Sequence, residues 1–198
     1  MEKLRSIYIA LINRGEKIMK KKEIVKLIEE YNNKVNKVSV NNALWYLSRQ
    51  NYIKRIFLDF YYINSIEERE LKYCKFTNKE LLFLVLDKLD IKWYLGLTSA
   101  RYSKGETWQT PNMLTILNNR FSGEKKIVGL KVKFIKIKEK RIFGLVREKT
   151  DKDIKYYYSD KEKTDLDEIY LSKKGKVATN KKTKTYLKNY PKWLQKST

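Results

Sequence analysis

Residues 39–63 read SVNNALWYLSRQNYIKRIFLDFYYI, and this stretch decides the predicted fold of the N-terminal part of the chain. Its first half predicts an amphipathic helix over residues 40–50, because apolar side chains recur there at every third or fourth position. These apolar positions are Val40, Leu44 and Leu47. The Ser39 hydroxyl is placed to cap this helix, since it can accept a hydrogen bond from an early helical N–H group.

The second half of the stretch predicts a β-hairpin. Residues 52–57 and 60–63 are rich in β-branched and aromatic side chains, which favour strands. Only Leu58 and Asp59 separate the two runs, so the connection between them must be a tight turn. The helix is therefore followed directly by two antiparallel strands.

Two further helices are predicted ahead of this stretch. Residues 2–14 and 20–31 both carry apolar side chains at helical spacing, and Gly15 is a natural end for the first helix. Three helices followed by a hairpin is the chain order of a winged helix-turn-helix domain. We therefore predict that domain for residues 1–64.

The rest of the chain predicts a second domain that mixes helices and strands. Residues 65–75 are highly charged, and we expect them to link the two domains. The second domain, residues 76–198, begins with a helix that Thr77 and Glu80 can cap reciprocally. That helix carries apolar side chains on nearly every side, which predicts that it is buried.

Strand-like segments dominate residues 113–159, and they are separated by Asn and Gly. A helix that Ser159 or Asp160 can cap follows, and a lysine-rich tail begins at about residue 172. The predicted fold class is thus α+β, with an N-terminal winged helix-turn-helix followed by a mixed α/β domain that contains an antiparallel sheet.

The chain carries a strong excess of positive charge. It has 45 Lys and Arg against 23 Asp and Glu, for a formal net charge of +22. Residues 1–64 hold 13 basic and 6 acidic side chains, whereas residues 172–198 hold nine basic side chains and no acidic one. Such an excess attracts polyanions, of which nucleic acid is the commonest. An anionic membrane surface or an acidic protein is the alternative partner.

Cysteine usage and hydropathy indicate the compartment. Cys74 is the single cysteine, so an intrachain disulfide is excluded and a reducing compartment is favoured. No apolar run reaches the length of a membrane span, and the N-terminus lacks the apolar segment of a signal peptide. We therefore expect a cytoplasmic protein with no membrane partner.

The helix predicted over residues 40–50 offers side chains suited to reading DNA. In helix-turn-helix proteins such a helix enters the major groove, where Asn can pair with adenine and Arg with guanine through two hydrogen bonds. Nearby cationic side chains contact phosphates and position the protein without reading sequence. The predicted DNA-binding residues are Lys20, Lys21, Lys22, Lys37, Ser39, Asn41, Asn42, Trp45, Tyr46, Arg49, Lys54 and Arg55.

A domain that only contacts other proteins is the alternative to this interpretation. In that case Trp45 and Tyr46 would be core or partly buried residues rather than DNA contacts. The basic tail from residue 172 would then coat RNA or a membrane surface. If the domain does bind DNA, the sequence leaves open whether it binds as a monomer or as a dimer.

The residue types on which most catalytic centres depend are scarce. The chain has no His, one Cys and no Gly-rich phosphate loop, so a zinc site and a Ser-His-Asp arrangement at Ser99 are both excluded. The aromatic and small-residue segment from Trp93 to Pro111 predicts close packing instead. We expect a protein that is not an enzyme and that uses neither a cofactor nor a metal.

Four carboxylates fall within a span of eight residues at the start of the helix predicted after Ser159, and they motivate a second hypothesis. Hard cations prefer clustered oxygen ligands, so a Mg²⁺-dependent nucleic-acid-processing protein is the alternative function. The residues concerned are Asp160, Glu162, Asp165 and Asp167. In a lysine-rich chain such a cluster more often forms ion pairs, and we favour this structural interpretation.

Three segments together resemble the AbiEi-type antitoxins of type IV toxin–antitoxin systems. VSVNNALWYLSRQNYIKRIFLDFYYIN resembles the winged helix-turn-helix that opens these antitoxins. KWYLGLTSARYSKGETWQTP and IKYYYSDKEKTDLDEIYL are similar to two later segments, in the expected order. The chain departs from the family pattern at Asp59-Phe60, where a Gly is usual in the wing, and at Arg101-Tyr102, where smaller or apolar residues are common.

The resemblance implies a function for each domain. The N-terminal domain would bind operator repeats in double-stranded DNA and repress its own operon. The second domain would counteract a toxin of the nucleotidyltransferase type. The positions that match the family pattern are implied to maintain the fold rather than to react; they are Ser99, Ala100, Gly105, Glu162, Thr164 and Asp167.

Overall fold

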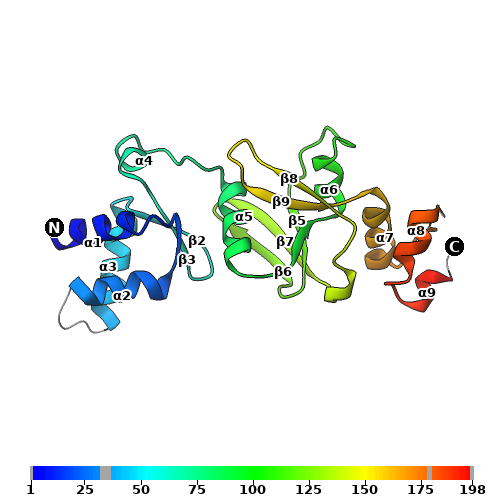
Figure 1. The fold of residues 1–198 in the computed structure, drawn as a ribbon, viewed down its shortest axis with the longest axis horizontal. Coiled ribbons are helices and arrows are strands. Elements are labelled where there is room, and N and C mark those ends of the chain that lie inside the picture. The colour runs from blue at the N-terminus through cyan, green and yellow to red at the C-terminus, as the bar shows by residue number, and fades with distance from the viewer. Residues whose placement is uncertain (1, 32–36, 178–179, 197–198) are drawn as a thin grey trace. The chain divides into compact units, whose positions relative to one another are not determined.

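The computed structural model describes residues 2–31, 37–177 and 180–196. It is an α+β protein (Figure 1) in which the chain divides into two compact units, Met1–Lys88 and Leu89–Thr198. In the described part of the chain, every helix is too short or too polar to cross a membrane.

The first unit contains three helices, a three-stranded sheet and two further helices. Its elements are α1 (Glu2–Asn13), β1 (Ile18–Lys20), α2 (Lys21–Tyr31), α3 (Lys37–Arg49), β2 (Ile53–Phe57), β3 (Phe60–Ile63), α4 (Ile66–Glu70) and α5 (Asn78–Lys88). The three predicted helices and the hairpin with its turn at Leu58-Asp59 are confirmed. Strand β1 was not predicted, because three residues are too few to show strand periodicity.

The sheet of this unit has the strand order β1-β3-β2, and all of its pairs are antiparallel. Ile18 pairs with Tyr62 and Ile53 pairs with Ile63, so β3 lies in the middle. Apolar side chains of α1, α2 and α3 form one core with this sheet. Its most deeply buried members are Ile7, Leu11, Met19, Ile24, Ile28, Leu47 and Ile53.

Helix α3 begins earlier than predicted. Its first residue is Lys37, so Ser39 lies inside the helix and the prediction that Ser39 caps it is wrong. Ser39 is thus the third residue of the helix. It still lies in the first turn, where the backbone N–H groups have no intrahelical acceptor. The buried stripe predicted for this helix is nevertheless present, since Val40, Leu44 and Leu47 all lie in the core.

Residues 65–75 are part of the first unit rather than an extended linker. Ser65 and Glu68 form a reciprocal capping box at the start of α4. The buried Glu68 carboxylate also accepts hydrogen bonds from the Tyr62 hydroxyl (2.6 Å) and from the Lys75 backbone N–H (2.7 Å). Helix α5 then contacts β1 and β2, so the unit ends at Lys88 instead of at the predicted residue 64.

The second unit is built on a six-stranded sheet with the order β6-β7-β5-β4-β9-β8. Its elements are β4 (Trp93–Leu95), α6 (Leu97–Ser103), β5 (Leu114–Asn118), β6 (Gly123–Ile127), β7 (Leu130–Lys136), a 3-10 turn (Glu139–Arg141), β8 (Leu145–Lys149), β9 (Lys155–Ser159), α7 (Lys161–Ser172), α8 (Lys181–Leu187) and α9 (Lys192–Gln195). The pairs β4–β9 and β5–β7 are parallel, so the sheet is mixed and the prediction of an antiparallel sheet is wrong. Parallel pairing joins strands that are distant along the chain, and strand periodicity does not reveal such pairing.

The predicted basic tail is folded. Helices α8 and α9 pack against α7 (Figure 1), and Leu187, Tyr190 and Leu194 share a buried cluster with Leu166. Pro191 separates α8 from α9 and lies just before the first residue of α9. An N–H group at the start of a helix has no intrahelical acceptor, so a proline, which lacks the N–H, is tolerated there. The segment from residue 172 is therefore a lysine-rich outer layer of the second unit.

Candidate nucleic-acid interface

Helix α3 has one face in the core and the opposite face in solvent. Val40, Leu44 and Leu47 are at most 7 % exposed. The residues of this helix that were predicted to read DNA are all exposed: Asn41, Asn42, Trp45, Tyr46 and Arg49. The helix is thus held from one side only, so its polar face is accessible within this unit.

The aromatic residues on this face are surface residues. Trp45 is 52 % exposed and Tyr46 is 47 % exposed, which contradicts the alternative that they belong to the core. Their rings meet edge to face with centroids 4.8 Å apart, and the Arg49 guanidinium lies 4.9 Å from the Trp45 ring centroid. A cation over the face of an indole is attracted by its quadrupole, so the three side chains hold one another in place on the surface.

Three consecutive lysines span the end of β1 and the start of α2, and one of them, Lys21, contacts α3. Lys21 Nζ donates to Asn41 Oδ1 over 3.4 Å, so the structure brings together two residues that are 20 positions apart. Lys22 is exposed, and Lys20 Nζ lies 5.6 Å from the Phe60 ring centroid. A cationic flank therefore adjoins the polar end of α3, as expected for a surface that contacts phosphates.

The two cationic residues of the hairpin have other partners. Lys54 Nζ donates to Asn78 Oδ1 at 3.3 Å, and Arg55 Nε donates to the Leu58 carbonyl at 3.0 Å. Within the described part of the chain, neither side chain forms a hydrogen bond or ion pair with α3. Lys37 is the first residue of α3, but its side chain lies outside the described residues.

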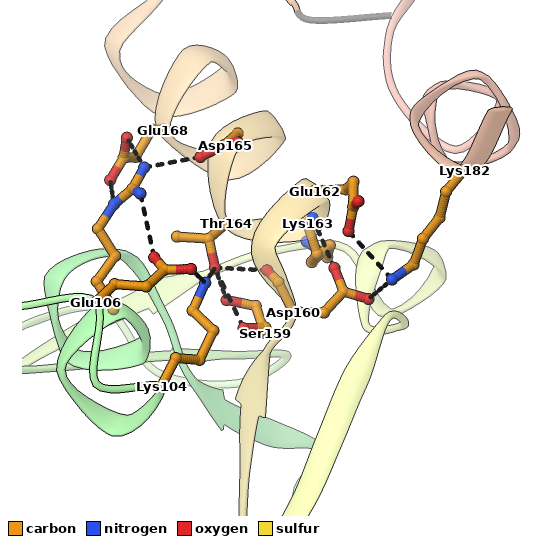
Figure 2. A network of polar contacts seen from close by, with 11 residues as sticks. Lys104, Glu106, Ser159, Asp160, Glu162, Lys163, Thr164, Asp165, Glu168 and Lys182 are labelled. Carbon is orange, nitrogen blue, oxygen red and sulfur yellow. Dashed lines mark hydrogen bonds and ion pairs between the residues drawn. The ribbon is translucent and has the colours of Figure 1, made fainter. Parts of the chain in front are cut away.

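The carboxylates of the acidic cluster in the second unit pair with cationic side chains. On one side of α7, Asp160 and Glu162 both meet Lys182, at 3.2 and 3.1 Å (Figure 2). Asp160 also accepts from the Lys163 backbone N–H (2.8 Å), so it caps α7 as predicted. The two carboxylates therefore share Lys182 as their cation, and Asp160 in addition caps the helix.

The other two carboxylates of the cluster point to separate cations. Asp165 and Glu168 each accept a hydrogen bond from Arg101 Nη2 over 2.8 Å (Figure 2). The hydrogen bond to Glu168 is the main cause that raises the pKa of Arg101; the one to Asp165 adds to it, and partial burial opposes both. Asp167 is buried and pairs with Lys163. In residues 2–31, 37–177 and 180–196, no group of three or more acidic or cysteine side chains could hold a metal ion. The four carboxylates of the alternative Mg²⁺ hypothesis thus divide among three cations, Lys182, Arg101 and Lys163, because successive turns of α7 face different neighbours.

The positions that match the antitoxin pattern make structural contacts. The Ser99 hydroxyl is buried and accepts from the Thr115 backbone N–H (2.9 Å), which joins α6 to β5. Thr164 Oγ1 donates to the Asp160 carbonyl (2.7 Å) and lies 2.7 Å from Ser159 Oγ (Figure 2). Gly105 has a φ of +73°, a conformation that a side chain would strain.

The chain was also compared with known proteins. Neither a protein-family model nor a curated protein matches it. The geometry of its own residues therefore carries the functional argument.

Sequence reasoning missed two features of the second unit. Lys163 is fully buried in a network with Asp167, Tyr94 and Tyr190, although lysine is normally a surface residue. The only signal for it was a Lys and an Asp four residues apart on one helix. The second missed feature is Trp193, an aromatic side chain of the lysine-rich segment that is 42 % exposed.

Proposed function

We propose that the first unit is a winged helix-turn-helix domain that binds double-stranded DNA with the exposed face of α3. The observation that carries this proposal is the division of α3 into a buried apolar stripe and an accessible face with Asn41, Asn42 and Arg49. Asn and Arg are the side chains that pair most specifically with adenine and guanine edges in the major groove.

The order of the elements supports the proposal. A short strand between the first two helices pairs with the second strand of the hairpin, so the sheet order is β1-β3-β2. This is the arrangement of winged helix domains, in which the sheet braces the third helix from one side. The contact between Lys21 and Asn41 adds a cation next to the residues that would meet the bases.

The cellular role that we propose is that of a transcriptional regulator and antitoxin. The domain would bind operator repeats upstream of its own gene in the cytoplasm, and the second unit would counteract a nucleotidyltransferase-type toxin. Support comes from the resemblance of three segments, residues 38–64, 92–111 and 154–171, to AbiEi-type antitoxins and from the structural contacts of the matched residues Ser99 and Thr164.

DNA binding is tested with the duplex that lies upstream of the gene and with a scrambled duplex of the same composition. We expect the full chain to shift the upstream duplex at lower protein concentration, and we expect N42A and R49A to remove that preference. N13A and R14A serve as matched controls, because Asn13 and Arg14 are exposed residues at the end of α1. Equal affinity of the unmodified chain for both duplexes would refute specific DNA binding and favour the protein-contact alternative.

The antitoxin role needs a separate experiment. We expect co-expression of the full chain to restore growth to cells that express a nucleotidyltransferase encoded next to the gene. N42A should retain this rescue, because the proposed antitoxin activity belongs to the second unit. A neighbouring nucleotidyltransferase whose toxicity is unaffected by the full chain would overturn the antitoxin role and leave the DNA-binding proposal intact.

A further inference from the structure

We propose that α8 and α9 form a second nucleic-acid-binding surface that takes single-stranded DNA or RNA. This proposal goes beyond operator binding by α3 and does not depend on it. Both helices are anchored through Leu187, Tyr190 and Leu194, which share one buried cluster. Because the anchor is common, the outward faces of the two helices are held at a fixed distance from each other.

The lysines of α8, together with its C-cap residue Lys188, divide into two groups. Lys182 faces α7 and pairs with Asp160 and Glu162. The other three, Lys181, Lys184 and Lys188, are exposed and recur every three or four residues, so they share the outer face. No ion pair to a carboxylate joins these three within the part of the chain that the structure describes. Like charges at this spacing repel one another, and a row of phosphates would neutralise them.

Helix α9 adds an aromatic ring to this cationic surface. Lys192, Trp193 and the C-cap residue Lys196 are exposed, whereas Leu194 is buried, and Trp193 is 42 % exposed. The Trp193 ring stacks on Tyr170 of α7, with planes 18° apart and centroids 6.3 Å apart. The indole is therefore already oriented, which lowers the entropy lost when a base stacks on it.

These features favour a single strand over a duplex or a membrane. A base can stack on Trp193 only if it is not already stacked in a duplex, and aromatic stacking beside cations is the usual way of binding unpaired strands. A membrane surface would require a wider apolar face. Trp193 is the one large apolar side chain exposed on the described residues of α8 and α9.

The test measures fluorescence anisotropy of labelled oligo(dT) and oligo(U) of about 16 nucleotides, the upper site size of a small single-strand-binding module. We expect W193A to weaken binding about 5- to 150-fold, the range for loss of one stacked base. W193F should retain most of the affinity because it keeps an aromatic face, whereas W193L should behave like W193A. W108A is the matched control, since Trp108 is 88 % exposed in another segment.

The lysines are tested through the salt dependence of binding. The triple variant K181Q/K184Q/K188Q should reduce the slope of log K against log salt by about 2, because each contacted phosphate of a single strand contributes about 0.7. The control triple variant K125Q/K126Q/K131Q has the same net charge and alters exposed residues of β6 and β7. The proposal is overturned if both triple variants lose equal affinity or if W193A binds as well as W193F. It is also overturned if, in the N42A/R49A double variant, a scrambled duplex or phosphatidylserine vesicles bind more tightly than the single strands. N42A and R49A should leave oligo(dT) binding unchanged, so a failure of operator binding is distinguishable from a failure of this surface.

Discussion

Lys163 and Asp167 lie one turn apart on α7 and form an ion pair from which solvent is excluded, with side-chain exposures of 0 % and 2 %. The Tyr94 and Tyr190 hydroxyls donate to the Asp167 carboxylate over 2.7 Å each, and Lys163 Nζ lies 2.9 Å from both hydroxyl oxygens. Burial lowers the pKa of Lys163, and the Asp167 carboxylate opposes that shift. The network joins β4, α7 and the segment between α8 and α9.

Breaking this pair should destabilise the second unit strongly. We expect K163M to lower the free energy of unfolding by about 3–5 kcal/mol, because it leaves the Asp167 charge buried without a cation. The double variant K163M/D167N should lose less than K163M, since no buried charge remains in it. Urea denaturation at neutral pH measures both, and K161M is the control at an exposed position of the same helix. Equal stability of K163M and K161M would contradict the structural role of the pair.

The buried core contact of α9 should matter more than its charge. L194A should lower the free energy of unfolding by about 2–4 kcal/mol, because Leu194 is fully buried and its loss leaves a cavity. K196A removes an exposed side chain and should change stability by less than about 0.5 kcal/mol. Thermal denaturation monitored by circular dichroism distinguishes the two. A small effect of L194A would mean that the lysine-rich segment is not part of the folded unit.

The first unit should lose stability in acid through Glu68. Burial raises the pKa of Glu68, but hydrogen bonds from the Ser65 N–H, the Tyr62 hydroxyl and the Lys75 N–H outweigh it, so the net pKa is lowered from 4.5. The contribution of this carboxylate to stability is therefore complete above pH 4.5 and is lost as the pH falls through the lower pKa of the folded state. We expect E68Q to be less stable than the unmodified chain at neutral pH and to show a weaker decline in acid.

The control for this prediction is E67Q, because Glu67 is the exposed neighbour of Glu68. Urea denaturation over a series of pH values should show that the stability of E67Q declines in acid as much as that of the unmodified chain. If E68Q and E67Q give the same pH dependence, the capping box does not carry the acid sensitivity.

The hairpin turn carries backbone strain at a position that glycine would relieve. Leu58 has a φ of +52°, in the left-handed region, and its side chain is 39 % exposed. L58G should raise the free energy of unfolding by up to about 1 kcal/mol, since the left-handed conformation disfavours a side chain by roughly that amount. L71G is the comparison variant, because Leu71 is 67 % exposed with a φ of −83°, and there the flexibility of glycine should destabilise. A loss of stability in L58G measured by thermal denaturation would show that side-chain contacts of Leu58 outweigh the strain.

Phosphate contact and base reading should separate on the proposed DNA surface. K22A should weaken binding to every duplex alike and lower the salt slope by about 1, because it removes one phosphate contact. N42A should instead reduce the preference for the upstream duplex by about 1–3 kcal/mol, with the slope unchanged. K3A is the control, as Lys3 is an exposed lysine of α1. Anisotropy titrations at several salt concentrations measure both quantities, and a slope change for N42A with no change in preference would contradict the assigned roles.

Local patterns were enough to predict most helices and the hairpin. The spacing of Val40, Leu44 and Leu47 identified the buried stripe of α3, and therefore also which residues of that helix face solvent. The alternating and aromatic runs around Leu58-Asp59 placed the turn. These features depend on neighbours a few residues away, because burial of one helix face and strand propensity are both recorded in a short window of sequence.

The sequence by itself thus determined most of the helices, the hairpin, the excess of positive charge and the absence of histidine chemistry. Only the tertiary structure decided that Asp160, Glu162, Asp165 and Asp167 divide among Lys182, Arg101 and Lys163. It also decided that strands β4 and β9 pair in parallel and that the described residues of the lysine-rich segment from residue 172 contribute to a buried core. Each of these depends on contacts between residues tens of positions apart, such as Tyr94 with Asp167. Periodicity along the chain cannot encode such contacts, because they are set by how complete elements pack.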